Sequence, residues 1–351
     1  MSKITIIGAG KTGRGFLARL LNGNEITFID KNKELVEKLN EQKTFEVAFF
    51  GNKQKSVNIS YNAAYTWEQI GEIDAELILV SVGGSNLADV GRELSKRIEK
   101  GQRIIVCENA SKPAQKLYDA IGIEGVMISE STVFCTTIEN GGININSEIY
   151  PYLQFDAEPM RENLPQIAGL KPVFEFGNFL TRKLYTYNSA SCVIAYLGAF
   201  KGFTVYSDAA NDEEILSLLD KNYEITNIAM CKEFGYEEDD QKEFALLSRA
   251  KFTDKTIVDT VARNAREPQR KIADKERIVG ILKLQAKYGL DTSVLEKTLA
   301  AALLYKGEGE EAWEEIISKG YEDVLSGLCG LDKGSDIYNR VLNMAQTKNI
   351  L

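Results

Sequence analysis

Short apolar runs alternate with helical periodicity through the first half of the chain. Residues 3–7 (KITII) form an apolar run that ends in a cluster of glycines. Apolar side chains then recur on one helical face: Phe16, Leu17, Leu20 and Leu21. A second strand-like run follows at 25–30 (EITFID), and Asn32 precedes the next helical pattern as a cap. The pattern therefore predicts a β-α-β unit at the N-terminus.

Two later apolar runs, 76–82 (ELILVSV) and 103–107 (RIIVC), each lead into another helical pattern. Strands that alternate with helices are typical of a doubly wound parallel sheet, so we expect a Rossmann-like α/β domain. Residues 45–59 alternate apolar and polar positions around Gly51, which predicts a small inserted hairpin.

The pattern changes near residue 178. Long segments of 3.6-residue periodicity dominate the second half: 179–200, 213–234, 241–250, 272–287 and 292–304. We expect two domains, a Rossmann-like domain over residues 1–178 and a mostly helical domain over 179–351. The acidic stretches 237–240 and 308–315 are expected to be solvated turns.

The composition excludes several classes of protein. A chain of 351 residues with 44% hydrophobic content can bury a sizeable core, and its net charge of −9 disfavours duplex nucleic acid as a partner. The five cysteines are scattered without a CxxC pair, which indicates reduced thiols and no structural zinc. No 18-residue apolar run or signal-peptide pattern occurs, so we expect a soluble cytoplasmic protein that binds no membrane.

The chain contains no histidine. This excludes Ser-His-Asp and Cys-His nucleophile pairs and histidine-ligated catalytic zinc. It also removes the side chain that most often serves as a general base near neutral pH. Any proton transfer must therefore use another group, and we expect no metal in the site.

The glycine cluster GAGKTGRG at 8–15 fits the GxGxxG fingerprint of dinucleotide-binding folds. In that fingerprint Gly8 allows a tight turn, Gly10 lets a pyrophosphate approach the backbone, and Gly13 lets the helix approach the strand. The alternative is a merely tight turn. The predicted cofactor contacts in this loop are Gly8, Ala9, Gly10, Lys11, Thr12 and Gly13.

Asp30 closes the second predicted strand, 17 residues after Gly13. A carboxylate there accepts hydrogen bonds from the adenosine ribose hydroxyls and repels a 2′-phosphate, so NAD is expected rather than NADP. Lys31 and Lys33 nearby weaken this preference.

The next two predicted strands also end in candidate site residues. Val82 and Gly83 follow the third core strand, where the backbone could lie against the cofactor or form an ordinary strand-ending turn. Glu108 and Asn109 follow the fourth, at the carboxyl edge where such sheets bind ligands. Either of these two side chains could instead cap a helix.

Without histidine, lysine, tyrosine and carboxylates remain as proton carriers. No tyrosine has a lysine four residues later, which disfavours short-chain dehydrogenases. Lys183, Asn188 and Ser191 stand at the start of an apolar helix and, at about 100° per residue, fan around part of it. The alternatives are a surface lysine, a hydrogen bonder at the helix start and a packing serine.

Several motifs together resemble the polyol-specific long-chain dehydrogenases, the mannitol dehydrogenase family. They span nearly the whole chain: GAGKTGRGF (8–16), FIDKN (28–32), IIVCEN (104–109), RKLYTYN with AYLG (182–198), REPQRK (266–271), YGL (288–290) and GLCGLD (327–332). The family signature is Lys-x4-Asn-x2-His, and Lys183 and Asn188 fall on its first two positions. The resemblance implies that Lys183 is the general acid/base and that Asn188 and Asn109 hold the reacting oxygen.

The chain departs from the family pattern in two places. Ser191 occupies the position of the signature histidine, and residues 131–136 (STVFCT) lack the Asp-Arg pair of the family. Ser191 is nevertheless expected at the substrate. Both departures bear on which substrate the chain takes more than on the type of reaction.

Arg266, Arg270 and Lys271 flank Pro268 and are the expected donors to a phosphorylated or polyhydroxy substrate. The resemblance places Arg270 at the substrate, whereas Arg266 and Lys271 could instead form an ion-pair cluster at a helix start. Asp274 and Arg277 are expected to be scaffold partners.

Lys183 must be neutral to accept a proton, so burial and nearby positive charge are expected to lower its pKa. The resemblance implies interconversion of a sugar alcohol and its ketose, mannitol 1-phosphate and fructose 6-phosphate, with NAD. An unphosphorylated polyol or a hexuronate as substrate, or a silent NAD-binding sensor, are the alternatives.

Overall fold

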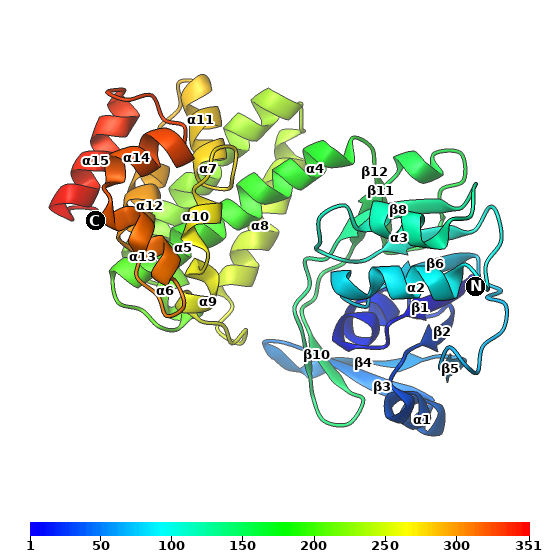
Figure 1. Cartoon of the computed structure of the whole chain (residues 1–351). Helices are drawn as coiled ribbons and strands as arrows, with labels where there is room; N and C mark the ends of the chain where they lie inside the picture. The colour runs from blue at the N-terminus through cyan, green and yellow to red at the C-terminus, as the bar shows by residue number, and fades with distance from the viewer. The chain divides into compact units, whose positions relative to one another are not determined.

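The computed structural model describes the backbone of residues 1–351 and all side chains except those of residues 52–54. The chain divides into two compact units, Met1–Gly177 and Asn178–Leu351. Strands and helices make up the first unit and helices the second (Figure 1), and each unit has its own hydrophobic core. The first is an α/β unit and the second is helical, which confirms the predicted fold class.

The first unit is built on an eight-stranded sheet with the order β12-β11-β8-β7-β6-β1-β2-β5. Its strands are β1 Lys3–Ile7, β2 Glu25–Ile29, β5 Ala63–Tyr65, β6 Leu77–Val80, β7 Arg103–Val106, β8 Met127–Thr132, β11 Leu153–Asp156 and β12 Leu170–Val173. All neighbouring pairs from β5 to β8 are parallel, and only the β8–β11 pair is antiparallel. Strand order reverses at β1, which opens a crevice at the carboxyl ends of the strands.

Helices cover this sheet and bury its apolar side chains. They are the π-helix η1 Gly13–Ala18, the α-helices α1 Lys33–Gln42, α2 Leu87–Leu94 and α3 Pro113–Ile121, and the 3₁₀ turns η2 Gly84–Asn86 and η3 Glu158–Met160. Asn32 caps α1 as predicted, because its side chain accepts a hydrogen bond from the Leu35 N–H. One core cluster lies between the sheet and helices α2 and α3.

A second, four-stranded sheet has the order β4-β3-β10-β9. Its strands are β3 Thr44–Phe49, β4 Asn52–Ser60, β9 Thr137–Glu139 and β10 Ile145–Ser147. Strands β3 and β4 form the predicted hairpin, whereas their pairing with the distant β10 was not predicted. The helix η1 packs against this sheet, since a Cβ at Gly15 would lie 2.3 Å from Ile145 Cγ2. All six residues of η1 are therefore buried.

The second unit is a helical bundle around α5. Its helices are α4 Phe176–Lys183, η4 Leu184–Asn188 (π), α5 Ser189–Phe200, α6 Tyr206–Ala210, α7 Glu213–Phe234, α8 Glu238–Thr253, α9 Val261–Ala265, α10 Pro268–Lys271, α11 Val279–Lys287, α12 Ser293–Leu304, α13 Glu311–Ser318, α14 Tyr321–Asp323, η5 Val324–Leu328 (π) and α15 Asp336–Thr347. Helix α5 packs against α6, α7, α9 and α12 and is apolar on almost every face. The unit's core is one cluster that includes α5.

Three predictions for this unit were wrong. The acidic run 237–240 is not a turn, because residues from Glu238 onward form the first turn of α8, where negative charge favours the positive end of the helix dipole. The stretch 308–315 contains the start of α13, whose Trp313 is buried. The segment 272–287 becomes helical only at Val279, since Lys275 adopts a positive φ of 65° that interrupts the helix.

Candidate functional site

A cleft of about 890 Å³ lies at the carboxyl edge of the large sheet. The strands from β5 to β8 in the sheet order each contribute residues that follow their ends: Trp67 after β5; Asp30 and Lys31 after β2; Gly8, Gly10, Lys11 and Thr12 after β1; Ser81, Val82, Gly83 and Gly84 after β6; Cys107, Glu108 and Asn109 after β7; Val133 and Cys135 after β8. Most of the predicted cofactor contacts therefore share one cavity in the first unit. Ala9 and Gly13 do not line it.

The three fingerprint glycines are required for different reasons. A Cβ at Gly8 would lie 2.0 Å from the Ser81 carbonyl oxygen, and one at Gly13 would lie 2.0 Å from the Gly8 carbonyl oxygen. Backbone packing alone therefore excludes a side chain at both positions. A Cβ at Gly10 would meet no heavy atom within 4 Å, so the space beside Gly10 is open to a ligand.

The Asp30 carboxylate ties two loops together. Its Oδ2 accepts a hydrogen bond from the Ala9 N–H at 2.7 Å, and its Oδ1 accepts one from the Asn32 N–H at 2.9 Å. Ala9 itself is fully buried, and its N–H donates to Asp30. Because an ionised carboxylate offers about four acceptor sites, Asp30 still has capacity for ribose hydroxyls.

The Glu108 carboxylate likewise accepts hydrogen bonds from the backbone of a neighbouring loop. Its Oε1 accepts hydrogen bonds from the N–H groups of Val82 and Gly83, both at 2.6 Å. Burial raises the pKa of Glu108, while these two N–H donors act in the opposite direction. Glu108 does not cap α3, whose N-cap residue is Lys112.

The Asn109 side chain bridges the ends of β7 and β8. Its Oδ1 accepts from the Val133 N–H at 3.1 Å and from the Thr132 hydroxyl at 3.2 Å, and its Nδ2 donates to the Val133 carbonyl oxygen at 2.9 Å. Asn109 is thus no helix cap. These bonds fix the orientation of an amide that carries a second N–H donor.

In the second unit, Lys183 is the last residue of α4 and is followed directly by the π-helix η4. The Ser189 N–H bonds to the Leu184 carbonyl oxygen, five residues back. A π turn holds more residues than an α turn, so each residue advances by less than 100°. The fan calculated with regular α-helical angles was therefore wrong, and Asn188 and Ser191 are rotated less from Lys183 than it predicts.

The pKa of Lys183 is lowered from 10.5 to about 7. Burial is the main cause, because it disfavours the ammonium form, and the positive charges of Lys251 and Arg277 act in the same direction. A lysine with this pKa exchanges a proton readily at neutral pH. By exposed area, the Lys183 side chain is partly buried.

Ser191 has a buried tyrosine as its partner. The Tyr206 hydroxyl donates to Ser191 Oγ at 3.0 Å, and Tyr206 is 5% exposed. Ser191 Oγ therefore accepts a hydrogen bond from one side, which leaves its own hydroxyl proton for another acceptor. Asn188, the last residue of η4, is only partly buried.

The predicted basic donors differ in their surroundings. Lys271 is 6% exposed, donates from Nζ to the Asn264 carbonyl oxygen at 2.5 Å, and has a pKa lowered by burial. Arg270 is exposed and pairs with Glu267 at 2.6 Å, so the ion pair at the start of α10 involves Arg270. Arg266 is exposed at the end of α9.

Two cations near Lys183 were missed as site residues. Lys251, in α8, was not singled out, and Arg277 was expected to serve only as a scaffold partner. Arg277 does pair with Glu276 at 3.2 Å, yet its charge also lowers the pKa of both Lys183 and Lys271. No local motif marks these residues, because they belong to segments far from Lys183 in the sequence.

Several absences hold for the described part of the chain. No three His, Cys, Asp or Glu side chains of the described residues are grouped so that they could hold a metal ion. None of the described helices has the length and apolar character to cross a membrane.

Comparisons with known proteins match both units. Residues 175–326 match the mannitol dehydrogenase C-terminal domain, and residues 4–151 match the ketopantoate reductase PanE/ApbA family. Curated relatives cover 97% of this chain and 97% of their own length. They include the mannitol-1-phosphate 5-dehydrogenases of Thermoanaerobacter pseudethanolicus and Caldanaerobacter subterraneus, 28% and 27% identical.

Solved structures share the fold over nearly the whole chain. A D-sorbitol dehydrogenase aligns with a TM-score of 0.78 at 13% identity, covering 98% of this chain and 92% of its own. Pseudomonas fluorescens mannitol 2-dehydrogenase, in a ternary complex with NAD and D-mannitol, aligns with a TM-score of 0.64 at 11% identity, covering 99% and 91%.

The curated relatives are named as dehydrogenases, and the chain is an oxidoreductase. The chain is thus similar to mannitol dehydrogenases over its C-terminal domain, residues 175–326, and to mannitol-1-phosphate 5-dehydrogenases over nearly its whole length.

Proposed function

We propose that the chain is an NAD-dependent dehydrogenase that interconverts mannitol 1-phosphate and fructose 6-phosphate. The observation that carries this proposal is Lys183, a partly buried residue at the end of α4 whose pKa is lowered to about 7. The full-length relatives named mannitol-1-phosphate 5-dehydrogenase support the choice of substrate.

The residues of the cleft fit a dinucleotide. The open space at Gly10 accepts a diphosphate, and Lys11 and Thr12 line the same stretch of the cleft. The free acceptor capacity of Asp30 suits ribose hydroxyls, and its negative charge favours NAD over NADP, although Lys31 beside it weakens that preference. Glu108 holds Val82 and Gly83 so that this loop presents a fixed backbone to the cofactor.

Lys183 carries the proton. In oxidation of the polyol, the neutral amine accepts the hydroxyl proton while the carbon–hydrogen bond breaks and the carbonyl forms. The bound nicotinamide supplies the hydride acceptor in this direction and the hydride donor in the other. In ketose reduction the protonated Lys183 returns the proton to the carbonyl oxygen. Asn188 and Asn109 are the proposed donors that stabilise the charge on that oxygen.

The charges around Lys183 favour an anionic substrate. Lys251 and Arg277 place positive charge near it, and Arg277 and Arg270 act in the same way on the buried Lys271. Like charges gathered in a partly buried region repel one another, and a phosphate would relieve that repulsion. Arg270, together with Arg266 and Lys271, is proposed to bind the phosphate or hydroxyl groups, and Ser191 a substrate hydroxyl.

A second candidate is the same chemistry on an unphosphorylated polyol or a hexuronate. Ser191 in place of the family histidine and the absence of the Asp-Arg pair at 131–136 favour it. A silent NAD-binding sensor is the third candidate, and retention of Lys183, Asn188 and Asn109 argues against it.

The test is NADH oxidation with fructose 6-phosphate, fructose and tagaturonate as separate substrates. We expect turnover of fructose 6-phosphate, and a loss of about 10²–10⁴-fold in kcat for Lys183→Ala, since this is the usual contribution of general acid–base catalysis. The rate of polyol oxidation should rise with pH through about 7, because only neutral Lys183 accepts a proton.

Lys319→Ala is the matched control, because Lys319 is an exposed lysine paired with Glu315 in the same unit. Its activity should equal that of the wild type. Turnover of fructose or tagaturonate without fructose 6-phosphate would replace the proposed substrate by the second candidate. NADH binding without turnover of any of the three would support the sensor.

A further inference from the structure

Trp67 stands at the end of the cleft where the edge strand β5 finishes. Among the described residues that line the cleft, Trp67 is the only one with an aromatic side chain. In the order of the strands, the cleft runs from Trp67 after β5 to Asp30 after β2 and then to Gly8 after β1. The aromatic ring is therefore next to the proposed ribose acceptor and on the side away from the glycine loop.

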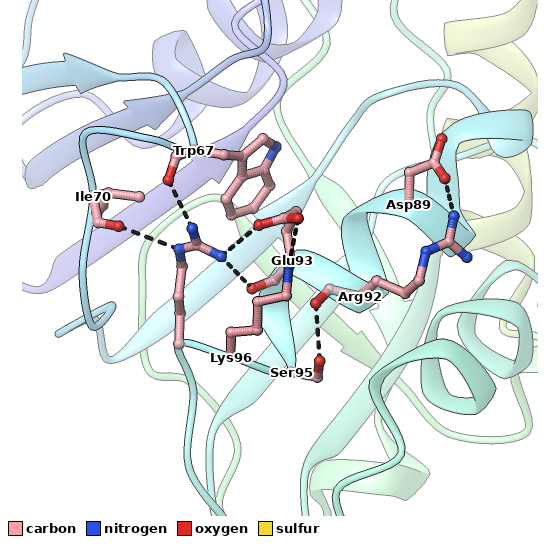
Figure 2. A network of polar contacts seen from close by, with 8 residues as sticks. Trp67, Ile70, Asp89, Arg92, Glu93, Ser95 and Lys96 are labelled. Carbon is pink, nitrogen blue, oxygen red and sulfur yellow. Dashed lines mark hydrogen bonds and ion pairs between the residues drawn. The ribbon is translucent and has the colours of Figure 1, made fainter.

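Arg97 holds this tryptophan in place. Its guanidinium carbon lies 5.3 Å from the centroid of the indole ring, and its Nη2 donates to the Trp67 carbonyl oxygen at 2.7 Å. Nε donates to the Ile70 carbonyl oxygen at 3.2 Å, and Nη1 donates to Glu93 Oε2 at 2.6 Å. Figure 2 shows this network, with the Trp67 indole beside the Glu93 carboxylate.

The loop around Trp67 is also closed locally. The Thr66 N–H donates to Gln69 Oε1 at 2.8 Å, and the Gln69 N–H donates back to the Thr66 carbonyl oxygen. The tryptophan is thus bound to its own turn and, through Arg97, to helix α2. A ring fixed in this way can stack on a planar ligand with little loss of conformational entropy.

We propose that the indole of Trp67 stacks on the adenine base of the dinucleotide. The guanidinium of Arg97 lies over one face of the ring, and Trp67 packs in part against the core of the first unit, so a base would contact the part of the ring that lines the cleft. A base at Trp67 places its ribose at Asp30 and its diphosphate at Gly10, which matches the order of these residues along the cleft. This inference rests on the proposed cofactor and adds the residue that recognises its base.

The other wall of this part of the cleft comes from α2. Asp89, Val90, Arg92 and Glu93 line it. Glu93 is engaged by Lys96 and Arg97, and Arg92 by Asp89, so the charged side chains of this wall already have partners. Stacking on Trp67 is therefore the main interaction that the cleft offers to a base at this end.

The chain offers a direct optical test, because it contains two tryptophans and the second, Trp313, is buried in the other unit. In Trp313→Phe, Trp67 is the only indole. Titration with ADP-ribose should quench its emission saturably, since stacking quenches an indole in contact. Nicotinamide mononucleotide, which lacks the adenine, should not. ADP-ribose is preferred to NADH because NADH also takes energy from distant tryptophans.

Calorimetric titration of variants gives the second measurement. Trp67→Ala should bind ADP-ribose about tenfold more weakly or worse, the usual size of a lost base stack, whereas Trp67→Phe should lose less because it keeps an aromatic face. Tyr65→Ala is the matched control, since it removes the aromatic side chain of the last residue of β5, which does not line the cleft. Its affinity should equal that of the wild type.

Two results would overturn the inference. Binding of ADP-ribose to Trp313→Phe without quenching places the base elsewhere, whatever the substrate proves to be. Equal affinities for Trp67→Ala and wild type do the same. Absence of any ADP-ribose binding to the wild type would overturn the proposed cofactor and this inference with it, so the two failures are distinguishable.

Discussion

The cleft of the first unit and the Lys183 region of the second unit are built in opposite ways. In the cleft, carboxylates turn inward to backbone N–H groups, as Asp30 does to Ala9 and Glu108 to Val82, and the resulting loops present backbone to a ligand. In the second unit, the proposed acid/base is a side chain, Lys183, and its surroundings act on it through burial and charge.

The difference separates two kinds of constraint. The cleft depends on steric exclusion at Gly8 and Gly13, where a single added carbon meets a carbonyl oxygen. In the Lys183 region, the important quantity is the pKa of one side chain, and each neighbouring charge changes that pKa by a limited amount. In the first unit, a single added methyl group should therefore have a large effect on stability or cofactor affinity. In the second unit, the effect on the pKa of Lys183 should scale with the charge or polarity removed.

Gly13→Ala and Gly10→Ala give the sharpest contrast within the cleft. The new Cβ at Gly13 would lie 2.0 Å from a carbonyl oxygen, so we expect a loss of about 1–3 kcal/mol or more in the free energy of unfolding. At Gly10 the methyl group meets no protein atom, so stability should be unchanged while NADH affinity falls. Urea denaturation and calorimetry measure the two effects.

If Gly13→Ala proved as stable as Gly10→Ala, the steric account of the glycine loop would be wrong. If Gly10→Ala bound NADH with unchanged affinity, the diphosphate would not lie beside Gly10. The two variants share the same chemical change, so each serves as the control for the other.

Lys183→Met tests the energetic constraint in the second unit. The pKa of Lys183 is about 7 in the folded protein and 10.5 without its surroundings, so the folded state is penalised wherever the unfolded lysine is charged. The substitution should stabilise the fold below pH 7, by on the order of 5 kcal/mol. That gain should shrink as pH rises from 7 toward 10.5, where the wild-type lysine is neutral in both states.

Thermal denaturation of both proteins between pH 6 and 10 measures this difference. A gain in Tm that stayed constant over the whole range would come from packing alone. It would show that Lys183 keeps an ordinary pKa, and the proposed acid/base role would lose its physical basis.

Tyr206→Phe and Ser191→Ala should have the smallest effects. Tyr206→Phe frees the Ser191 hydroxyl to rotate, and Ser191→Ala removes that hydroxyl. For each variant we expect KM for the ketose to rise by about fivefold or less, the value of one neutral hydrogen bond, with kcat little changed. Because both residues act through the same hydroxyl pair, the double variant should be no worse than the poorer single one. Additive losses in steady-state kinetics would contradict this coupling.

The architecture of the first unit could be predicted because its rules act locally. Strand-helix alternation, the fingerprint glycines and Asn32 as a cap each depend on a few consecutive residues. The pairing of β10 with β3 could not be predicted, since it joins segments about a hundred residues apart. In the second unit, the start of α11 was placed too early because periodicity does not reveal the positive φ at Lys275.

The candidate site shows the same limit. The motif identified Lys183 and its need for a lowered pKa, but not Lys251, which contributes to that shift from another helix. The hydroxyl pair of Ser191 and Tyr206 likewise joins α5 to α6 by tertiary packing. The π turn of η4 was missed because sequence periodicity assumes a constant advance per residue, and this altered the expected angles of Asn188 and Ser191.

The buried Arg14 has a consequence for any attempt to shorten this protein. Its Nε donates to the Ala9 carbonyl oxygen at 2.7 Å and its Nη1 to the Ile143 carbonyl oxygen at 2.6 Å, so one guanidinium holds both the glycine loop and the turn between β9 and β10. Removal of the four-stranded sheet would leave the charged Arg14 buried in the first unit without its Ile143 partner. A minimal version of the first unit would therefore need a neutral, smaller residue at position 14 before the appendage could be removed.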